Sequence, residues 1–176
     1  MKVERKCKIV SKEQMGDAIY MVLEAGDMVR TSFRAPGQFV HVKCGEGLLL
    51  RRPLSVCSCM EDEPVDTLAI VFEVRGEGTD WLARRPVGHS LDVLGLAGNG
   101  FTMKPEGRYL LVGGGIGIPP MRGCAQYTQG KSTAILGGRS ADKIILQDRF
   151  RDECAKVLIA TDDGSLGHHG FVDALV

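Results

Sequence analysis

Apolar and polar residues alternate in short runs along the first hundred residues of the chain. The run from Phe39 to Lys43 alternates strictly, which is typical of a strand with one buried face. Glycine and proline residues separate the runs, as they do in antiparallel β-structure. The pattern predicts an antiparallel barrel or sandwich with one short helix at residues 79–84. Strands are expected at residues 6–10, 18–23, 39–43, 54–59, 67–74 and 90–94, separated by turns at 35–37, 61–64, 75–78 and 86–88.

The pattern changes near residues 105–107, beyond which predicted strands and helices alternate. Such alternation indicates parallel strands joined by crossover helices. We therefore predict two domains, at residues 1–101 and 107–176. The second has only three predicted strands and stops where residues 170–176 begin another helix, so we expect an incomplete domain in a fragment of a longer protein; a short chain completed by a partner is the alternative. Its strands are expected at 108–112, 132–136 and 156–160, and its helices at 120–128 and 140–151, the latter capped by Ser140.

Composition narrows the classes of function. The 22 basic and 22 acidic residues cancel, which gives no indication of binding to nucleic acid or to an anionic membrane. No apolar stretch approaches the roughly 18 residues of a membrane span. The cytoplasm is therefore the expected compartment. Six cysteines are present without any C-x2-C pair, so the sequence predicts reduced thiols and no metal site.

Residues 109–120 form the most informative segment, Tyr-Leu-Leu-Val-Gly-Gly-Gly-Ile-Gly-Ile-Pro-Pro. A buried strand followed by a glycine turn and a helix start offers free N–H groups to a phosphate. The segment therefore predicts a nucleotide site. It departs from the usual G-x-G-x-x-G pattern because Pro120 replaces the third glycine, and Arg139 follows the second strand where an acidic residue would hold a ribose.

Two further motifs are compatible with phosphate binding. Arg52 precedes Ser55 by three residues, so a guanidinium could pair with a diphosphate while the hydroxyl faces a ring nitrogen. Gly78 and Thr79 stand at a probable helix start. Each motif alone is equally explained by solvated arginines or by a capped turn. Together, in order, they resemble the ferredoxin-reductase superfamily and, within it, the electron-transfer subunits of bacterial NAD-linked dihydroorotate dehydrogenases. The matching segments are residues 36–39, 52–55, 76–79, 95–101, 113–120 and 161–167.

This resemblance implies a β-barrel that binds FAD, followed by an α/β domain that binds NAD(H). Leu54 stands where many members of the superfamily carry an aromatic residue, which removes ring stacking but keeps an apolar wall. The resemblance also implies that Arg139 contacts the adenosine side of the nicotinamide nucleotide. An arginine there could accept a 2′-phosphate, so both NAD and NADP are possible ligands. The alternative is that Arg139 is an exposed residue at the N-terminal flank of a helix. The FAD residues implied are Arg52, Pro53, Leu54, Ser55, Phe72, Glu73, Val74, Gly78 and Thr79, and those for the nicotinamide nucleotide are Gly114, Gly115, Gly117, Pro119 and Arg139.

The function implied is an NAD-linked flavin oxidoreductase subunit that exchanges electrons with a dihydroorotate dehydrogenase catalytic subunit, in a heterotetramer serving pyrimidine biosynthesis. A sister reductase serving ferredoxin, sulfide dehydrogenase or hydrogenase is the alternative, and a non-catalytic flavin-binding fragment is a third. The family also implies a [2Fe–2S] cluster, whose cysteine ligands this chain lacks. Hydride transfer needs stacked rings rather than a protein acid, so Asp162 and Asp163 are not predicted to be catalytic. His168 and His169 are expected in a surface loop.

Overall fold

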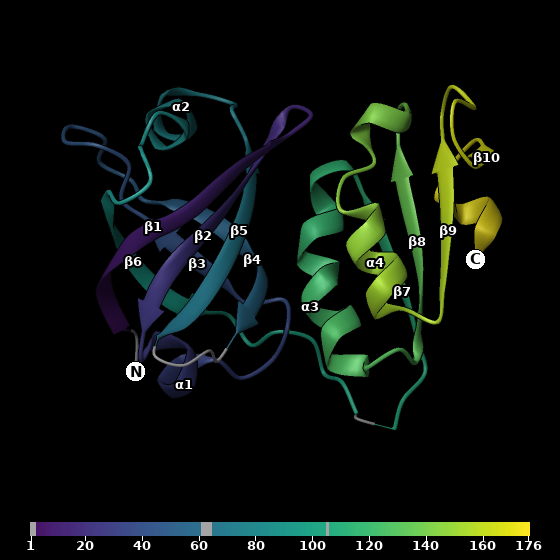
Figure 1. Ribbon diagram of the computed structural model, residues 1–176, viewed down its shortest axis with the longest axis horizontal. Coiled ribbons are helices and arrows are strands. Elements are labelled where there is room, and N and C mark those ends of the chain that lie inside the picture. The colour runs from purple at the N-terminus through teal and green to yellow at the C-terminus, as the bar shows by residue number, and fades with distance from the viewer. Residues whose placement is uncertain (1–2, 61–64, 105) are drawn as a thin grey trace. The chain divides into compact units, whose positions relative to one another are not determined.

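The computed structural model describes residues 3–60, 65–104 and 106–176 (Figure 1). The turn predicted at residues 61–64, and Pro105 in the predicted boundary, lie outside this part. The chain divides into two compact units, Met1–Phe101 and Thr102–Val176. Each unit has its own sheet.

The first unit is a closed antiparallel barrel, as the resemblance implied. Its strands follow the order β1-β2-β5-β4-β3-β6, and β6 returns to pair with β1. All six strands were predicted, although most extend beyond the predicted ends. They are β1 Val3–Met15, β2 Ala18–Gly26, β3 Phe39–Val42, β4 Arg52–Met60, β5 Asp66–Glu73 and β6 Ser90–Ala97.

Alternate residues of these strands fill the barrel with apolar side chains. Met21 and Leu23 of β2 and Ile70 of β5 are fully buried there, because inward residues recur at every second position. Two short helices flank the barrel, α1 Met28–Ser32 and α2 Glu77–Ala83. The prediction of a single helix was therefore wrong. Helix α1 has only five residues, too few to show a helical period in the sequence, and the side chain of its N-cap residue, Asp27, makes no capping hydrogen bond.

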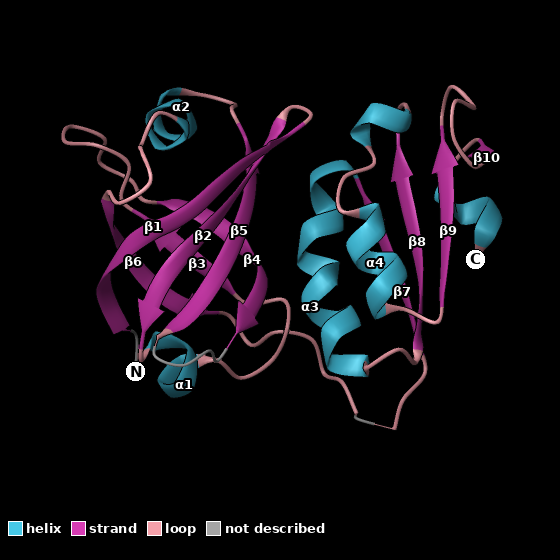
Figure 2. Ribbon diagram, viewed as in Figure 1, coloured by secondary structure: helices cyan, strands magenta, loops and turns pink. Residues whose placement is uncertain are grey.

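The second unit is a parallel sheet of order β10-β9-β8-β7. Helices α3 and α4 lie on one face of it (Figure 2). The fourth strand, β10, is short and was not predicted; its two histidines are exposed, but they form a strand rather than a loop. The elements are β7 Tyr109–Gly114, β8 Ser132–Gly138, β9 Lys156–Thr161, β10 His168–His169, α3 Ile118–Thr128 and α4 Gln147–Glu153, with 3-10 turns η1 Gly115–Gly117, η2 Ala141–Lys143 and η3 Val172–Leu175.

The helix predicted at residues 140–151 is the clearest error. Ser140 precedes only the turn η2, and its hydroxyl hydrogen bonds to the Asp142 carboxylate instead of capping a helix. The next three residues, Ile144 to Leu146, are all buried, which one face of a helix cannot achieve. Leu146 adopts a left-handed conformation with φ of 62°, and α4 begins only after it.

A largely buried ion pair joins α3 to α4. Nη2 of Arg122 lies 2.7 Å from Oε1 of Glu153, and Nε lies 3.0 Å from the same oxygen. Gln126 donates a third hydrogen bond to this oxygen, at 3.1 Å. Burial strengthens the attraction but makes the loss of either partner costly.

Among the described residues, no helix is both long and apolar enough to cross a membrane.

Candidate functional site

Two adjacent arginines at the start of β4 have different surroundings. Arg51 donates to the Asp92 carboxylate at 2.8 Å and to the Asp92 carbonyl at 3.1 Å, and it also pairs with Glu4. The hydrogen bond to Asp92 raises the pKa of Arg51. Although partial burial acts in the opposite direction, bonding to Arg51 lowers the pKa of Asp92. Arg51 therefore makes its hydrogen bonds within the barrel.

Arg52, in contrast, keeps most of its donors available. In the described part of the chain, its guanidinium donates only to the Leu50 carbonyl, at 2.7 Å. A guanidinium has five N–H donors in a fork that suits phosphate oxygens. The structure thus leaves Arg52, the arginine that the sequence pattern selected, as the one of the two that is able to bind an anion.

The Arg52 side chain packs directly against the first turn of α2. A Cβ atom added to Gly78 would lie 2.5 Å from Nε of Arg52, so a glycine is required for this approach. Thr79 shapes the same turn, because its hydroxyl accepts the backbone N–H of Arg75 at 2.8 Å and that of Gly76 at 3.2 Å. The two segments predicted to hold a diphosphate therefore meet, and their cradle fits that group.

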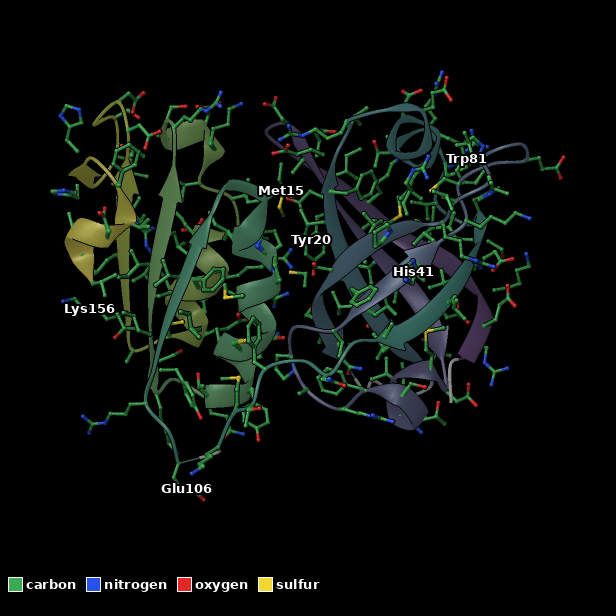
Figure 3. The ribbon with its side chains drawn as sticks, turned by 180° about the vertical axis from the view of Figure 1, so that it is seen from behind. Met15, Tyr20, His41, Trp81, Glu106 and Lys156 are labelled. Carbon is green, nitrogen blue, oxygen red and sulfur yellow. The ribbon has the colours of Figure 1, made fainter. Side chains whose placement is uncertain are left out.

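The outer face of β3 and β4 extends this site along the barrel. Pro53 and Ser55 are exposed there, and β3 places His41 and Phe39 directly opposite them. The two aromatic rings pack edge to face with their centroids 5.2 Å apart; Figure 3 labels His41 on this strand. Neither residue was among those predicted to bind FAD, although Phe39 ends the matching segment 36–39 and the alternation at residues 39–43 placed both on one face. They form a partly apolar surface beside Ser55, with the planes of the two rings inclined at 69° to each other.

The other residues implied for FAD are less uniformly placed. Leu54 points inward and packs against the barrel core, so Pro53 contributes more to an outer apolar wall. Phe72 is also in the core, with 2% of its surface exposed, which leaves only its backbone for ligand contact. Glu73 accepts a hydrogen bond from Nε of Arg75 at 2.7 Å. Val74 is exposed. Their contact with a flavin stays a prediction.

In the second unit, the glycine turn after β7 combines a tight bend with open backbone. A Cβ atom at Gly113 would lie 2.9 Å from the Gly117 carbonyl, so the turn requires glycine. Gly115 has a φ of +52°, and an added Cβ there or at Gly117 would meet nothing within 4 Å. Pro119 lies in the first turn of α3, where its missing N–H costs no hydrogen bond. A phosphate could therefore approach the turn closely.

The turns after β8 and β9 lie beside this glycine turn at the carboxyl edge of the sheet. Gly114 pairs in register with Gly137, whose outer side is covered by Val172. Arg139 is exposed, and its guanidinium has no partner among the described residues. Open α/β sheets bind ligands at this edge. The structure thus brings together the backbone segments predicted to bind the nicotinamide nucleotide.

Of the two aspartates after β9, Asp163 stabilises the turn that contains it through its side chain. The Asp163 carboxylate accepts the Ser165 N–H at 2.9 Å and its hydroxyl at 2.6 Å, and the hydroxyl bond lowers the pKa of Asp163. The Thr161 hydroxyl donates to the Leu166 carbonyl at 2.8 Å and so closes the same turn. Residues 161–167 therefore form the predicted turn.

The cysteines are free thiols. Burial raises the pKa of Cys7 and of Cys124 to about 11, which leaves both protonated at neutral pH. In the part of the chain that the structure describes, no group of three or more histidine, cysteine or acidic residues could hold a metal ion. The described cysteines therefore do not fit a [2Fe–2S] cluster.

Comparison with known proteins gives the same classification. The chain is 36% identical, over 96% of its length, to the dihydroorotate dehydrogenase B (NAD(+)) electron transfer subunit of Bacillus mycoides, and 35% identical to that of Bacillus cereus. The chain belongs to this family. It spans 66% of the length of these relatives. No protein-family model matches it.

Two solved structures share the fold. The NADH-dependent reduced ferredoxin-NADP oxidoreductase superposes with a TM-score of 0.81 at 28% identity, over 97% of this chain and 62% of that one. The FAD/NAD-binding domain of nitric oxide dioxygenase from Vibrio cholerae has a TM-score of 0.78 at 19% identity, over 95% and 78% of the two chains. The predicted family and fold class, a flavin-type barrel followed by an α/β nucleotide-binding fold, are thus confirmed.

Proposed function

We propose that this chain is the FAD-containing part of an NAD-linked electron-transfer subunit. It accepts hydride from NADH, or delivers it to NAD, and exchanges electrons with a dihydroorotate dehydrogenase catalytic subunit in the cytoplasm. The observation that carries the proposal is the contact between Arg52 and Gly78, which forms an anion cradle in a chain related to such subunits. When bound, FAD supplies the chemistry, because it takes two electrons as hydride and releases them to an acceptor.

The protein's own residues bind and orient the cofactors. Arg52 and the first turn of α2 hold the diphosphate, and the outer face of β4 presents the Ser55 hydroxyl to the flavin ring. In the second unit, Gly115 and Gly117 let the nicotinamide nucleotide approach the backbone, while Arg139 faces its adenosine side. No acid or base is assigned, because hydride transfer depends on the distance and orientation of two rings. No step is routed through an iron–sulfur cluster.

The proposal is tested by adding FAD to purified protein under anaerobic conditions and then titrating with NADH. We expect a yellow complex whose visible absorption bleaches with NADH; NADPH is titrated in parallel to settle the nucleotide preference. A protein that stays colourless with excess FAD would refute flavin binding. A yellow protein that neither nucleotide bleaches would instead favour a flavin-binding fragment without reductase activity.

A sister reductase is the second candidate. The 28% identity to the NADH-dependent reduced ferredoxin-NADP oxidoreductase favours it. The two candidates differ in the electron acceptor, so the bleached protein should be mixed with ferredoxin and, separately, with a dihydroorotate dehydrogenase catalytic subunit. Reoxidation by the catalytic subunit together with orotate supports the first proposal, and reoxidation by ferredoxin alone supports the second.

A further inference from the structure

Helix α2 carries Gly78, against which Arg52 packs, yet the helix has little support of its own. It has seven residues, and isolated helices of that length are not stable in water. In this fully described helix, no basic residue lies in the last turn, where a cation would offset the partial negative charge of the free carbonyls. The position of α2 therefore depends on contacts from elsewhere in the barrel.

Lys12 of β1 supplies a cation at this end of the helix. Its ammonium group donates to the carbonyls of Ala83 and Arg85, each at 2.8 Å. These carbonyls are 71 and 73 residues away along the chain, so the contact exists only in the folded barrel. The last carbonyls of a helix have no partner within it, and a cation there is favourable. Lys12 therefore holds the C-terminal end of α2 against β1.

The Trp81 side chain provides a second support for the same end of α2. The Arg85 guanidinium lies 4.4 Å from the centroid of the Trp81 ring, and its Nε donates to the Trp81 carbonyl at 3.1 Å. His89 packs edge to face on this ring, with the centroids 5.8 Å apart; Figure 3 labels Trp81. Because Lys12 bonds to the carbonyl of the same Arg85, the two supports are joined.

Gly78 lies toward the opposite end of this short helix. Five residues separate it from Ala83, or about 7.5 Å along a helix. A Cβ atom at Gly78 would lie 2.5 Å from Nε of Arg52, so this contact leaves no room even for a methyl group. A tilt of α2 at its C-terminal end would therefore change where Gly78 meets the Arg52 guanidinium.

We propose that Lys12 is a positioning residue for FAD binding, which acts through α2 on Arg52 and does not touch the cofactor. If α2 is docked for only part of the time, the apparent affinity for FAD falls by the docked fraction. Lys12 raises that fraction. The inference rests on the proposed function, because the contact between Arg52 and Gly78 matters for FAD only if the diphosphate binds there.

The test compares FAD affinity in the unaltered protein and in three variants by flavin fluorescence titration. In Lys12→Met, the dissociation constant should rise about fivefold, as expected when a helix C-terminus loses its cation. Arginine keeps the charge and the donors, so Lys12→Arg should bind FAD within about twofold of the unaltered protein. Lys8→Met is the matched control, because Lys8 is exposed on the same strand and lies opposite Glu24 and Ser90.

Hydrogen exchange separates positioning from a general loss of stability. In FAD-free Lys12→Met, the amides of α2 should exchange faster than in the unaltered protein, while those of the barrel strands should not change. Saturating FAD should restore the protection of α2, because it binds the docked helix. The midpoint of urea unfolding should stay the same, since Lys12 is exposed.

Unchanged FAD affinity in Lys12→Met would overturn the inference. An equal loss in Lys8→Met would show only a general effect of charge on an anionic ligand, and an equal loss in Lys12→Arg would show that the cation is not what matters; both also overturn it. A lowered urea midpoint with faster exchange throughout the barrel would show a purely structural role. If the unaltered protein binds no FAD, the proposed function fails and the inference with it, a result that is readily told apart from the others.

Discussion

The substitution Arg52→Met gives the most direct test of the anion cradle. Methionine keeps much of the apolar stem and removes every donor. Within the described residues, the one hydrogen bond lost is the exposed one to the Leu50 carbonyl, so the free energy of unfolding should fall by about 0.5–1 kcal/mol. A hydrogen bond to a charged phosphate contributes about 1.5–3 kcal/mol. The dissociation constant of FAD should therefore rise roughly 10- to 150-fold.

Arg51→Met is the matched control, since it changes the neighbouring residue in the same way. It breaks the partly buried ion pair with Asp92 and the more exposed one with Glu4, so it should destabilise the barrel by about 1–2 kcal/mol. FAD affinity should not change. Flavin fluorescence titration measures binding, and urea unfolding of the FAD-free protein measures stability. Weakened FAD binding in Arg51→Met together with normal binding in Arg52→Met would refute the reasoning.

Three further predictions concern the rest of the structure. Gly113→Ala should destabilise the second unit by about 1–3 kcal/mol because its methyl group meets backbone, whereas Gly117→Ala should fold normally yet weaken NADH binding in a titration. Arg122→Met should cost about 3 kcal/mol in urea unfolding by leaving the largely buried Glu153 carboxylate without its cationic partner and with only the hydrogen bond from Gln126, and adding Glu153→Met should recover much of this loss. The pKa of Asp92 is lower in the folded protein than its value of 3.8 in the unfolded chain, so ionised Asp92 stabilises the fold at pH values above 3.8. This stabilisation is lost as the pH falls through the lowered pKa. The free energy of unfolding should therefore decrease less steeply below about pH 4 in Asp92→Asn.

Strand positions were predictable because they depend on local alternation. The barrel strands and the three longer parallel strands all carry apolar residues at the spacing that burial requires. The segment at residues 140–151 defeated the same reasoning. Its apolar residues have a spacing compatible with a helix, but tertiary packing buries Ile144, Ile145 and Leu146 together and turns the backbone left-handed at Leu146. Burial by distant elements overrode local preference there.

The candidate site was only partly predictable for a similar reason. Sequence motifs identified the glycines and Arg52, but the reason why Arg51 is not available depends on Asp92, which is 41 residues away. Phe39 and His41 could be placed on one face of a strand, yet their position opposite Ser55 follows from strand pairing, which alternation does not specify. The sequence therefore indicated the chemistry more reliably than the arrangement of groups.

The turns after β8 and β9 are joined by several hydrogen bonds. The N–H groups of Asp162 and Asp163 donate to the carbonyls of Gly138 and Arg139, at 3.0 and 3.1 Å, and the Ser165 hydroxyl accepts the Ala141 N–H at 2.9 Å. A replacement of the turn after β8 that moves its backbone would therefore disturb the turn after β9 as well. When these turns are replaced by those of a reductase with a different nucleotide preference, both should be exchanged together. Exchanging one turn alone would leave hydrogen-bond donors and acceptors mismatched between the two turns.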